Sequence, residues 1–247
     1  MNPPYYARLW AELLPRYMDN LVAAAARSEA RLVVLDNVYM LGRPQGKPLD
    51  EDSPTRPCSR KGEVRARVAE RMWEAHRRGD VRATTGRASD FYGPGGTLTH
   101  KGDQFWRPAI AGKRARVLVD PDAVHTYHYI PDVAAGLAAL GTASDEAYGR
   151  PWMLPCAPAG TMRDLVARFS RELGREIKLM VMPRPVLKML ALPVTFLREI
   201  EEMMYQWEEP FRINDRRFRE RFGQGPEDVE RAAAATVAWA KAHYANM

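Results

Sequence analysis

The stretch Arg31-Leu32-Val33-Val34-Leu35 is a short, continuous apolar run that contains two β-branched residues. Such a run is typical of a strand covered on both faces, as the strands of parallel sheets are. The residues before it, Ala7 to Ala30, are rich in Ala and Leu at helical spacing, and Pro15 predicts a kink or a restart near Leu14. We therefore predict a helix that leads into a buried strand.

Helices and strands alternate along the rest of the chain. A loop rich in Gly, Pro and acidic residues, 42–57, precedes an amphipathic helix over 61–79 and a strand over 81–89. The alternation at this spacing indicates an α/β fold with a largely parallel sheet. The remaining predicted strands are 115–119, 126–130, 151–154 and 177–182. The remaining predicted helices are 133–140, a helix capped by Thr161 that runs to Leu173, 185–207 with a break at Pro193, and 226–244.

The composition is that of a globular protein. Hydrophobic residues make up 46% of the chain and charged residues 28%, which excludes a disordered chain and a collagen-like fibre. The apolar stretches 186–197 and 232–240 are shorter than the roughly 18 residues that cross a bilayer, and no secretion signal is visible. Cys58 and Cys156 form no Cys-x-x-Cys pair, so they indicate neither a zinc site nor a disulfide framework. We expect a cytoplasmic protein without a membrane partner.

The net charge of +6 is concentrated in one segment. Residues 56–82 contain nine Lys or Arg and four Asp or Glu. This surplus favours either an anionic partner or a solvated helix face, on which Glu63 and Arg67 are spaced to pair. No spacing typical of zinc fingers, basic zippers or RNA-binding motifs accompanies it, so we expect no nucleic-acid partner.

Four segments in order carry a family resemblance. They are Leu35-Asp36-Asn37-Val38-Tyr39-Met40-Leu41-Gly42, Lys61 at a helix start, Arg87-Ala88-Ser89-Asp90-Phe91-Tyr92-Gly93-Pro94-Gly95, and His125-Thr126-Tyr127-His128-Tyr129-Ile130-Pro131-Asp132-Val133-Ala134. Together they resemble the extended short-chain dehydrogenase/reductases, the NAD(P)-dependent sugar epimerase and dehydratase group, over nearly the whole chain. The Tyr-Gly-Pro-Gly loop and the Tyr-Ile-Pro-Asp-Val-Ala segment are the most specific matches.

The resemblance implies an incomplete Rossmann-like fold with a mostly parallel sheet and a smaller C-terminal α+β portion that binds the substrate. Residues 1–92, with 131–156 returning to them, would form the C-terminal half of a nucleotide-binding domain. Residues 93–130 and 157–247 would form the substrate-binding portion. The implied function is NAD(P)-dependent oxidoreductase or epimerase chemistry on a carbonyl or alcohol of a small, sugar-nucleotide-like substrate.

The same resemblance implies roles for single residues. Asn37 stands where the family has a Ser or Thr that orients the substrate. Lys61 matches the lysine that binds the nicotinamide ribose and lowers the pKa of a neighbouring tyrosine, because a nearby cation favours a phenolate. The implied cofactor contacts are Lys61, Ser89, Tyr92, Gly93 and Pro94, and the implied substrate contacts are Asp90, Phe91, His125 and Tyr129.

Two departures from the family pattern stand out. The catalytic tyrosine of the family lies four residues before the lysine, and position 57 is Pro. Tyr39, two residues beyond Asn37, shares its face if the strand continues, so we hypothesise that Tyr39 and Lys61 form the acid/base pair. The alternative is that Tyr39 only packs against the sheet.

The second departure is that no G-x-x-G-x-x-G or G-x-G-x-x-G turn occurs in the sequence. That turn brings the backbone to the pyrophosphate of a dinucleotide. In the resemblance, Asn2-Pro3-Pro4-Tyr5 falls just after the fourth strand, so the first βα units are missing. NAD or NADP binding is then expected to be weak or absent if the chain is complete as written. The strand at 32–35 would become a sheet edge, which favours association, including a homodimer.

Two other classes of protein remain open. One is a catalytically silent protein that binds a nucleotide or small molecule in the same pocket, and the other is an interaction subunit that completes its sheet with another chain. His125 and His128 point to opposite faces of a strand, so we expect no metal site. Tyr205 and Trp207 either line the substrate pocket or pack in the core.

Overall fold

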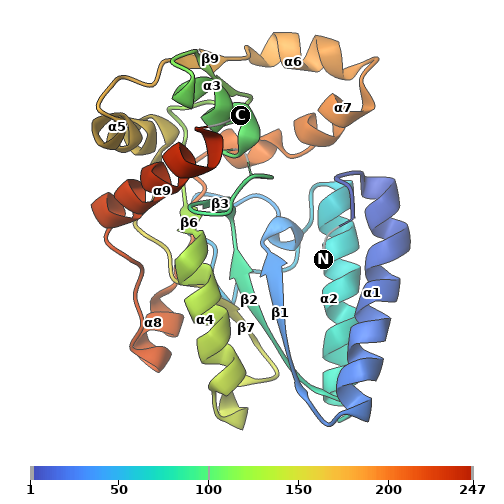
Figure 1. Cartoon of the computed structure of the whole chain (residues 1–247). Helices are drawn as coiled ribbons and strands as arrows, with labels where there is room; N and C mark the ends of the chain where they lie inside the picture. Colours follow the sequence, from blue (N-terminus) through green and yellow to red (C-terminus); the bar gives the residue numbers. More distant parts are fainter. Residues whose placement is uncertain (1–2, 100, 246–247) are drawn as a thin grey trace.

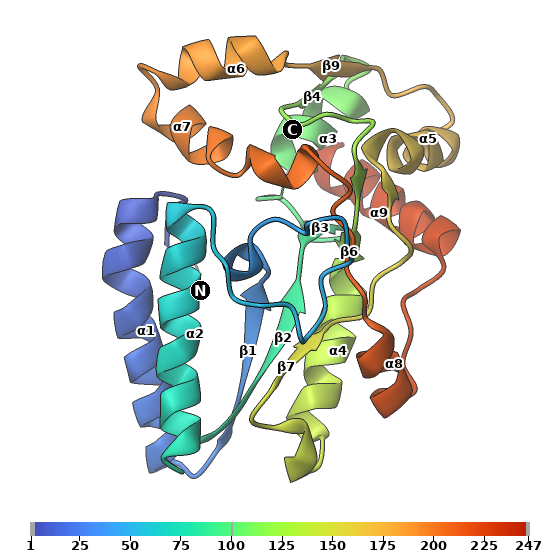
Figure 2. The ribbon, with the colours of Figure 1, turned by 180° about the vertical axis from the view of Figure 1, so that it is seen from behind.

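The centre of the computed structural model, which describes residues 3–99 and 101–245, is a parallel three-stranded sheet. Its strands are β1 (Arg31–Asn37), β2 (Arg82–Ala88) and β7 (Pro151–Met153), in the order β1-β2-β7. Helices α1 (Ala7–Arg27) and α2 (Arg60–Arg77) lie on one side of this sheet and α4 (Ile130–Thr142) on the other (Figures 1 and 2). The predicted α/β class with a mostly parallel sheet is confirmed.

Strand β1 is an edge of the sheet, as predicted. It pairs with β2 through its full length, and among the described residues no strand lies on its other side. Leu32 is buried, but the side chain of Leu35 is 43% exposed. The strand is therefore less completely covered than its continuous apolar run predicts, because its outer neighbour is absent from the described sheet.

Helix α1 continues through Pro15 without a break, so the predicted restart near Leu14 is wrong. Trp10, Leu14 and Met18 are buried on one face of α1 and pack in a cluster with residues of α2. Pro15 removes one backbone hydrogen bond from the helix. The free energy gained from this tertiary packing exceeds that loss, so the helix continues through Pro15.

The excess positive charge of residues 56–82 lies largely on the outer face of α2 and the turn that follows it. Arg71 pairs with Asp19, and Arg77 pairs with Glu70, and both of these arginines are about half exposed. The solvated helix face is therefore the interpretation that the structure favours over an anionic partner at this surface.

A second layer of short elements lies beyond the carboxyl ends of β1 and β2 (Figure 1). Its strands form two-stranded sheets, β3 with β6, β4 with β9 and β5 with β8. Pro193 separates α6 from α7, which confirms the predicted break. The remaining elements of the chain, in this layer and around the central sheet, are β3 (Asp90–Tyr92), α3 (Asp103–Ile110), β4 (Ala115–Val117), β5 (Val124–His125), β6 (Tyr127–Tyr129), β8 (Gly160–Thr161), α5 (Met162–Leu173), β9 (Leu179–Val181), α6 (Arg184–Ala191), α7 (Thr195–Glu201), α8 (Arg216–Phe222) and α9 (Val229–Tyr244), with single turns η1 (Tyr39–Leu41), η2 (Asp145–Ala147) and η3 (Met204–Trp207).

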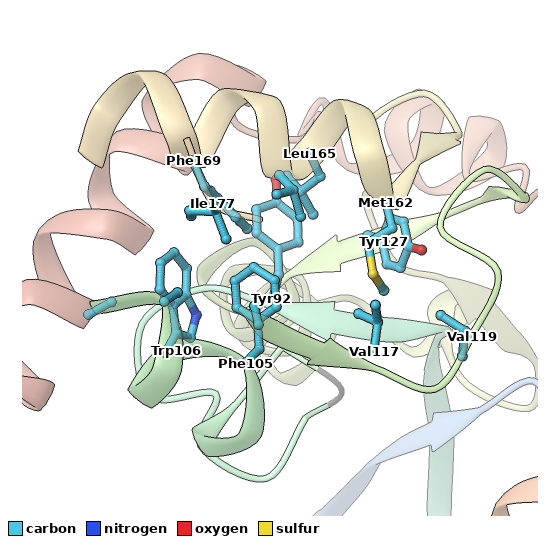
Figure 3. Packing of buried hydrophobic residues seen from close by; sticks show 14 of the residues in the cluster. Tyr92, Phe105, Trp106, Val117, Val119, Tyr127, Met162, Leu165, Phe169 and Ile177 are labelled. Atoms are coloured by element: carbon cyan, nitrogen blue, oxygen red, sulfur yellow. The ribbon is translucent and has the colours of Figure 1, made fainter. Parts of the chain in front are cut away.

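An aromatic core holds this second layer together. Phe169 of α5 lies against the rings of Tyr92, Phe105 and Trp106, with ring centroids 5.0 to 6.3 Å apart (Figure 3). All four side chains are buried. Aromatic side chains bury large apolar areas, so this cluster anchors β3, α3 and α5 in one unit.

The division into a nucleotide-binding and a substrate-binding portion stays a proposal. Most of residues 157–247 pack around the aromatic core, but α8 returns to the central sheet. Phe218 of α8 is fully buried and packs in the same cluster as Trp152 of β7 and Leu140 of α4. Residues 157–247 therefore contribute to two hydrophobic cores, so the predicted boundary at residue 157 does not separate one core from the other.

Thr161 caps the N-terminus of α5 as the sequence indicates. Its hydroxyl accepts from the backbone N–H of Asp164, and the Asp164 carboxylate accepts from the backbone N–H of Thr161. We expect Thr161→Ala to lower the free energy of unfolding by about 1 kcal/mol, because a first-turn N–H loses its partner. Urea unfolding measures the change. Thr142→Ala at the C-terminal end of α4 is the matched control and should be nearly neutral, since that hydroxyl only bonds back to carbonyls of its own helix.

Candidate active site

Asp90 lies at the carboxyl end of the central sheet, two residues after the last residue of β2. It begins β3, where it lies opposite Tyr127 of β6 in a parallel pair. Its Oδ2 lies 2.8 Å from Nε2 of His125, whose side chain is fully buried. The structure therefore brings together two of the residues predicted to contact substrate, at the edge of the sheet where α/β proteins bind ligands.

The imidazole of His125 is held in a fixed orientation. The rings of Trp207 and Phe211 stack against it, with centroids 4.9 and 5.1 Å away. Its Nδ1 lies 3.3 Å from the backbone carbonyl of Gln206. The carbonyl oxygen and the carboxylate oxygen both accept only, so each ring nitrogen of His125 faces an acceptor, Nδ1 the Gln206 carbonyl and Nε2 the Asp90 carboxylate.

Lys101 joins this group from the loop before α3. Its side chain is only 2% exposed, and its Nζ lies 3.8 Å from the centroid of the Tyr127 ring. Among the described residues, Nζ has no hydrogen-bond partner. Burial lowers the pKa of Lys101 to about 8, and the negative charge of Asp90 opposes this shift. A buried ammonium that is this poorly satisfied is suited to binding an anionic or carbonyl oxygen.

Tyr39 does not lie on an extension of β1. The strand ends at Asn37, whose Oδ1 accepts from the backbone N–H of Tyr39, and the chain turns into η1. The expectation that Asn37 and Tyr39 share one strand face is therefore wrong, because an Asn side chain offers the backbone a turn in place of the sheet ladder. The Tyr39 hydroxyl lies 3.3 Å from that of Tyr5.

The surroundings of Tyr39 disfavour a phenolate. Burial raises its pKa, and the charge of Asp90 raises it further. Lys61 does not offset this, since its Nζ lies 4.6 Å from the centre of the Tyr5 ring, and it is the Tyr5 hydroxyl that contacts Tyr39. The hypothesis that Tyr39 and Lys61 act as a pair remains a prediction, but the structure places Tyr5 between them.

Lys61 is fully buried and is engaged by α7. Its Nζ forms an ion pair with Oε2 of Glu199 and donates to the Glu199 carbonyl at 3.0 Å. Burial alone raises the pKa of Glu199, but the hydrogen bond and charge of Lys61 outweigh it and hold the pKa below its ordinary value. The amine that the family uses for the nicotinamide ribose therefore already has acceptors within this chain.

Glu199 and its neighbour Glu202 fix α7 to the start of α2. Oε2 of Glu199 also accepts from the backbone N–H of Ala7 at 3.0 Å. Glu202 accepts from the backbone N–H of Lys61 at 3.0 Å and pairs with Arg60. Carboxylates at a helix N-terminus are stabilised by its unpaired N–H groups, so these contacts hold the end of α7 against the first turns of α1 and α2.

Ser89 and His128 tie the ends of neighbouring strands together. The Ser89 hydroxyl donates to the Thr126 carbonyl, and its backbone N–H donates to Nδ1 of His128. Nε2 of His128 then donates to the Leu154 carbonyl, so the imidazole is neutral, and burial lowers its pKa to about 4. The Ser89 hydroxyl, predicted to contact the cofactor, is thus engaged within the protein. Within residues 3–99 and 101–245 no group of three metal-ligating side chains occurs.

The other predicted contacts lie outside this group. Tyr92 and Tyr129 pack against each other at the edge of the aromatic core, with ring centroids 5.4 Å apart. Gly93, at φ +126°, lies where a Cβ would meet the Tyr129 ring. Pro94 follows it in the same turn and is partly buried. Phe91 packs in a different cluster, on the side of α4, so it and Asp90 point away from each other.

Two residues of the site were not predicted from the sequence. Lys101 follows the Tyr-Gly-Pro-Gly loop by six residues and carries no motif of its own. Glu199, with Glu201 and Glu202 beside it in a predicted helix, is a residue that the sequence assigns to a solvated helix face, yet its side chain is only 6% exposed. The run of three glutamates beside apolar residues, Glu199, Glu201 and Glu202, was the one available signal, because a buried lysine requires a nearby acceptor.

Fold and site together define the class: an α/β protein with a parallel sheet, helices on both faces, and a buried polar group beyond the strands' carboxyl ends. The model of the NAD dependent epimerase/dehydratase family matches residues 15–152. The chain belongs to this family. No curated protein matches it significantly in sequence.

Solved structures share the fold at low sequence identity. A UDP-glucuronic acid 4-epimerase from Bacillus cereus, in complex with NAD and a fluorinated UDP-sugar, has a TM-score of 0.73 at 12% identity and covers 92% of this chain and 67% of its own. A dTDP-glucose 4,6-dehydratase from Streptomyces venezuelae with NAD bound has a TM-score of 0.73 at 16% identity, covering 97% and 69%. The chain thus spans about two thirds of the length of these enzymes.

Proposed function

We propose that the chain is an NAD(P)-dependent oxidoreductase of the epimerase or dehydratase type that acts on a carbonyl or alcohol of a small, sugar-nucleotide-like substrate. The observation that carries the proposal is the buried group of Asp90, Lys101 and His125 at the carboxyl ends of the strands. Membership of the family and the substrates named for the structural neighbours support the substrate class.

The chain's own residues supply binding and proton transfer in this proposal. The ammonium of Lys101 attracts a carbonyl or phosphate oxygen, and Asp90, oriented by His125, accepts from a sugar hydroxyl. Since the pKa of Lys101 is about 8, this amine can also give up or take a proton near neutral pH. Asn37 remains the candidate to orient the substrate at the same sheet edge, and Tyr39 remains the candidate for proton transfer.

The residues present do not fit a nicotinamide ribose as the family lysine would hold it. Nζ of Lys61 is already satisfied by the carboxylate and the carbonyl of Glu199. The sequence also contains no glycine-rich turn for the pyrophosphate. We therefore assign no step to a cofactor, and its use by this chain requires Glu199 to leave Lys61.

A catalytically silent binding protein is the second candidate. It is favoured by the same ion pair together with Pro57 in place of the family tyrosine. In this case the Asp90 group binds the ligand, and no turnover follows. The exposed edge of β1 leaves a sheet-completing subunit as a further alternative.

Ligand titration separates these candidates. The purified chain is mixed with UDP-glucuronic acid, dTDP-glucose, NAD or NADP, and binding is followed by thermal shift and calorimetry. We expect a UDP- or dTDP-sugar to raise the melting temperature, because a ligand bound only by the native state stabilises it. Turnover of the sugar with added NAD or NADP supports the enzyme, and binding without turnover supports the silent protein. If no sugar nucleotide binds, both proposals fail.

Tyr39→Phe tests one residue assignment in the same assay. Loss of a proton-transfer group lowers turnover by about 10²–10⁴-fold. Turnover within a factor of about two of the wild-type value would instead make Tyr39 a packing residue. Tyr17→Phe, at a partly buried tyrosine of α1 in the cluster behind the sheet, is the matched control.

A further inference from the structure

Exposed large apolar side chains are concentrated on β9, α6 and α7. Eleven such side chains are more than a third exposed among the described residues, and eight of them lie between positions 180 and 196. The exposed fraction reaches 61% for Met189 and 76% for Leu192. We name this region the α6–α7 surface, formed by Met180, Val181, Val186, Met189, Leu190, Leu192, Val194 and Phe196.

The exposure follows from how α6 packs. Leu187 and Ala191, four residues apart, are buried against the rest of the molecule. Val186, Met189 and Leu190 therefore lie on the outer side of the helix, although they are as apolar as the inner residues. β9 and α6 lie at the outer edge of the second layer, and α7 packs beside α6 (Figures 1 and 2). A solvated helix normally carries polar residues on its outer side, so this surface indicates a binding partner.

All charged side chains between residues 177 and 198 are positive, and the glutamates that end α7 are Glu199, which is buried and paired with Lys61, and Glu201, which is partly buried. Residues 177–198 contain Lys178, Arg184, Lys188 and Arg198 and no Asp or Glu. The segment thus carries a net charge of +4. Glu208, from outside the segment, pairs with Arg184. Lys178 and Lys188 are exposed beside the apolar side chains.

The charge discriminates between partners. In a two-fold dimer formed through this surface the same cationic patch would face itself, which is unfavourable. An anionic lipid surface would bind both the apolar side chains and the positive charges of this surface. Apolar side chains enter the boundary between headgroups and acyl chains, while Lys and Arg contact the negatively charged headgroups. We propose that the α6–α7 surface binds peripherally to membranes that contain anionic lipids.

This proposal is independent of the function proposed above. It also differs from the expectation of no membrane partner, which depended on the lack of a stretch long enough to cross a bilayer. None of the helices in the described part of the chain is long and apolar enough to span one. Peripheral binding requires only an amphipathic surface.

Vesicle co-sedimentation tests the proposal. The full chain is mixed with phosphatidylcholine vesicles, with and without phosphatidylglycerol. We expect binding to the vesicles with phosphatidylglycerol, weak binding to those without, and release at high salt, because salt screens charge attraction. Removing one cation with Lys188→Gln should weaken binding about fivefold.

Apolar contact is tested separately. Met189→Glu with Leu192→Glu should lower the partition coefficient at least about tenfold, since two large side chains would no longer be buried. Leu21→Glu, at an exposed leucine of α1 distant from this surface, is the matched control and should bind as the wild type does. All three side chains are exposed, so unfolding temperatures should stay unchanged.

Two results would overturn the proposal. The first is that the protein sediments equally with both types of vesicle, or that it sediments with neither. The second is a concentration-dependent dimer that Met189→Glu with Leu192→Glu dissociates, which would assign the surface to a second copy of the chain.

Discussion

Lys61→Met is expected to lower the free energy of unfolding by about 3–5 kcal/mol. The variant removes the buried cation of Glu199 and leaves this buried carboxylate only the longer contact with the exposed Arg60, at 3.6 Å, and breaking a buried pair in this way costs this much. Glu199→Ala should have an effect of similar size, because it leaves the Lys61 ammonium in the same position. Urea unfolding followed by tryptophan fluorescence measures both.

The double variant Lys61→Met with Glu199→Leu tests whether the loss of stability in the single variants comes from the one charge that each leaves buried. Replacing both partners by apolar side chains removes both buried charges, so most of the lost stability should return. Arg163→Ala is the matched control. Its pair with Asp122 is about 60% exposed on both sides, and such pairs contribute about 1 kcal/mol or less. Equal effects of Lys61→Met and Arg163→Ala would contradict the buried ion pair.

The ion pair of Lys61 and Glu199 also makes the free energy of unfolding depend on pH in the acid range. The pKa of Glu199 in the folded protein lies below its ordinary value. The stability that it contributes is therefore present above the unfolded-state pKa of about 4.3 and is lost as the pH falls through the lower folded value. Lys61→Met should weaken this acid dependence, which a series of urea unfolding curves at decreasing pH detects.

Lys101→Met is expected to act in the opposite direction on stability. The buried ammonium of Lys101 has no hydrogen-bond partner among the described residues, so an apolar side chain of similar length should stabilise the fold. We expect a gain of about 1–3 kcal/mol at neutral pH, since one unit of pKa shift corresponds to about 1.4 kcal/mol. The same variant should lose sugar-nucleotide binding by about tenfold or more, because the charge that attracts the ligand is gone.

The pH dependence gives this second prediction its sharpest test. The pKa of Lys101 in the fold is about 8, below the ordinary value of about 10.4. Between these values the unfolded chain binds more protons, so the stability of the wild type rises with pH through this window. Lys101→Met should remove that rise, whereas Lys113→Met, at an exposed lysine, should keep it. A less stable Lys101→Met protein that still binds ligand would make Lys101 a structural residue.

A gain in stability with a loss of binding is characteristic of a residue kept for function. A buried, poorly satisfied charge is costly to the fold and is useful when a ligand supplies the missing partner. The opposite responses expected at Lys61 and Lys101 follow from one difference, because Glu199 satisfies the first ammonium and none of the described residues hydrogen-bonds the second.

The sequence alone predicted the elements that local patterns control. The apolar run of β1, the Thr161 cap and the break at Pro193 each depend on residues within one element or turn, so their physical chemistry is readable from spacing. The edge position of β1 also followed from the family resemblance. The family resemblance also named Asp90 and His125 as substrate contacts, and the structure brings these two side chains together.

The tertiary structure decided the charge partners. Glu199 lies 138 residues from Lys61, and Lys101 is buried by strands and loops that are distant from it in sequence. Burial determines whether a charge needs a partner, and burial is a property of the packed molecule rather than of a segment. For this reason the sequence determined the parallel sheet, whereas only the fold determined which of the two buried lysines is paired with a carboxylate and which has no hydrogen-bond partner among the described residues.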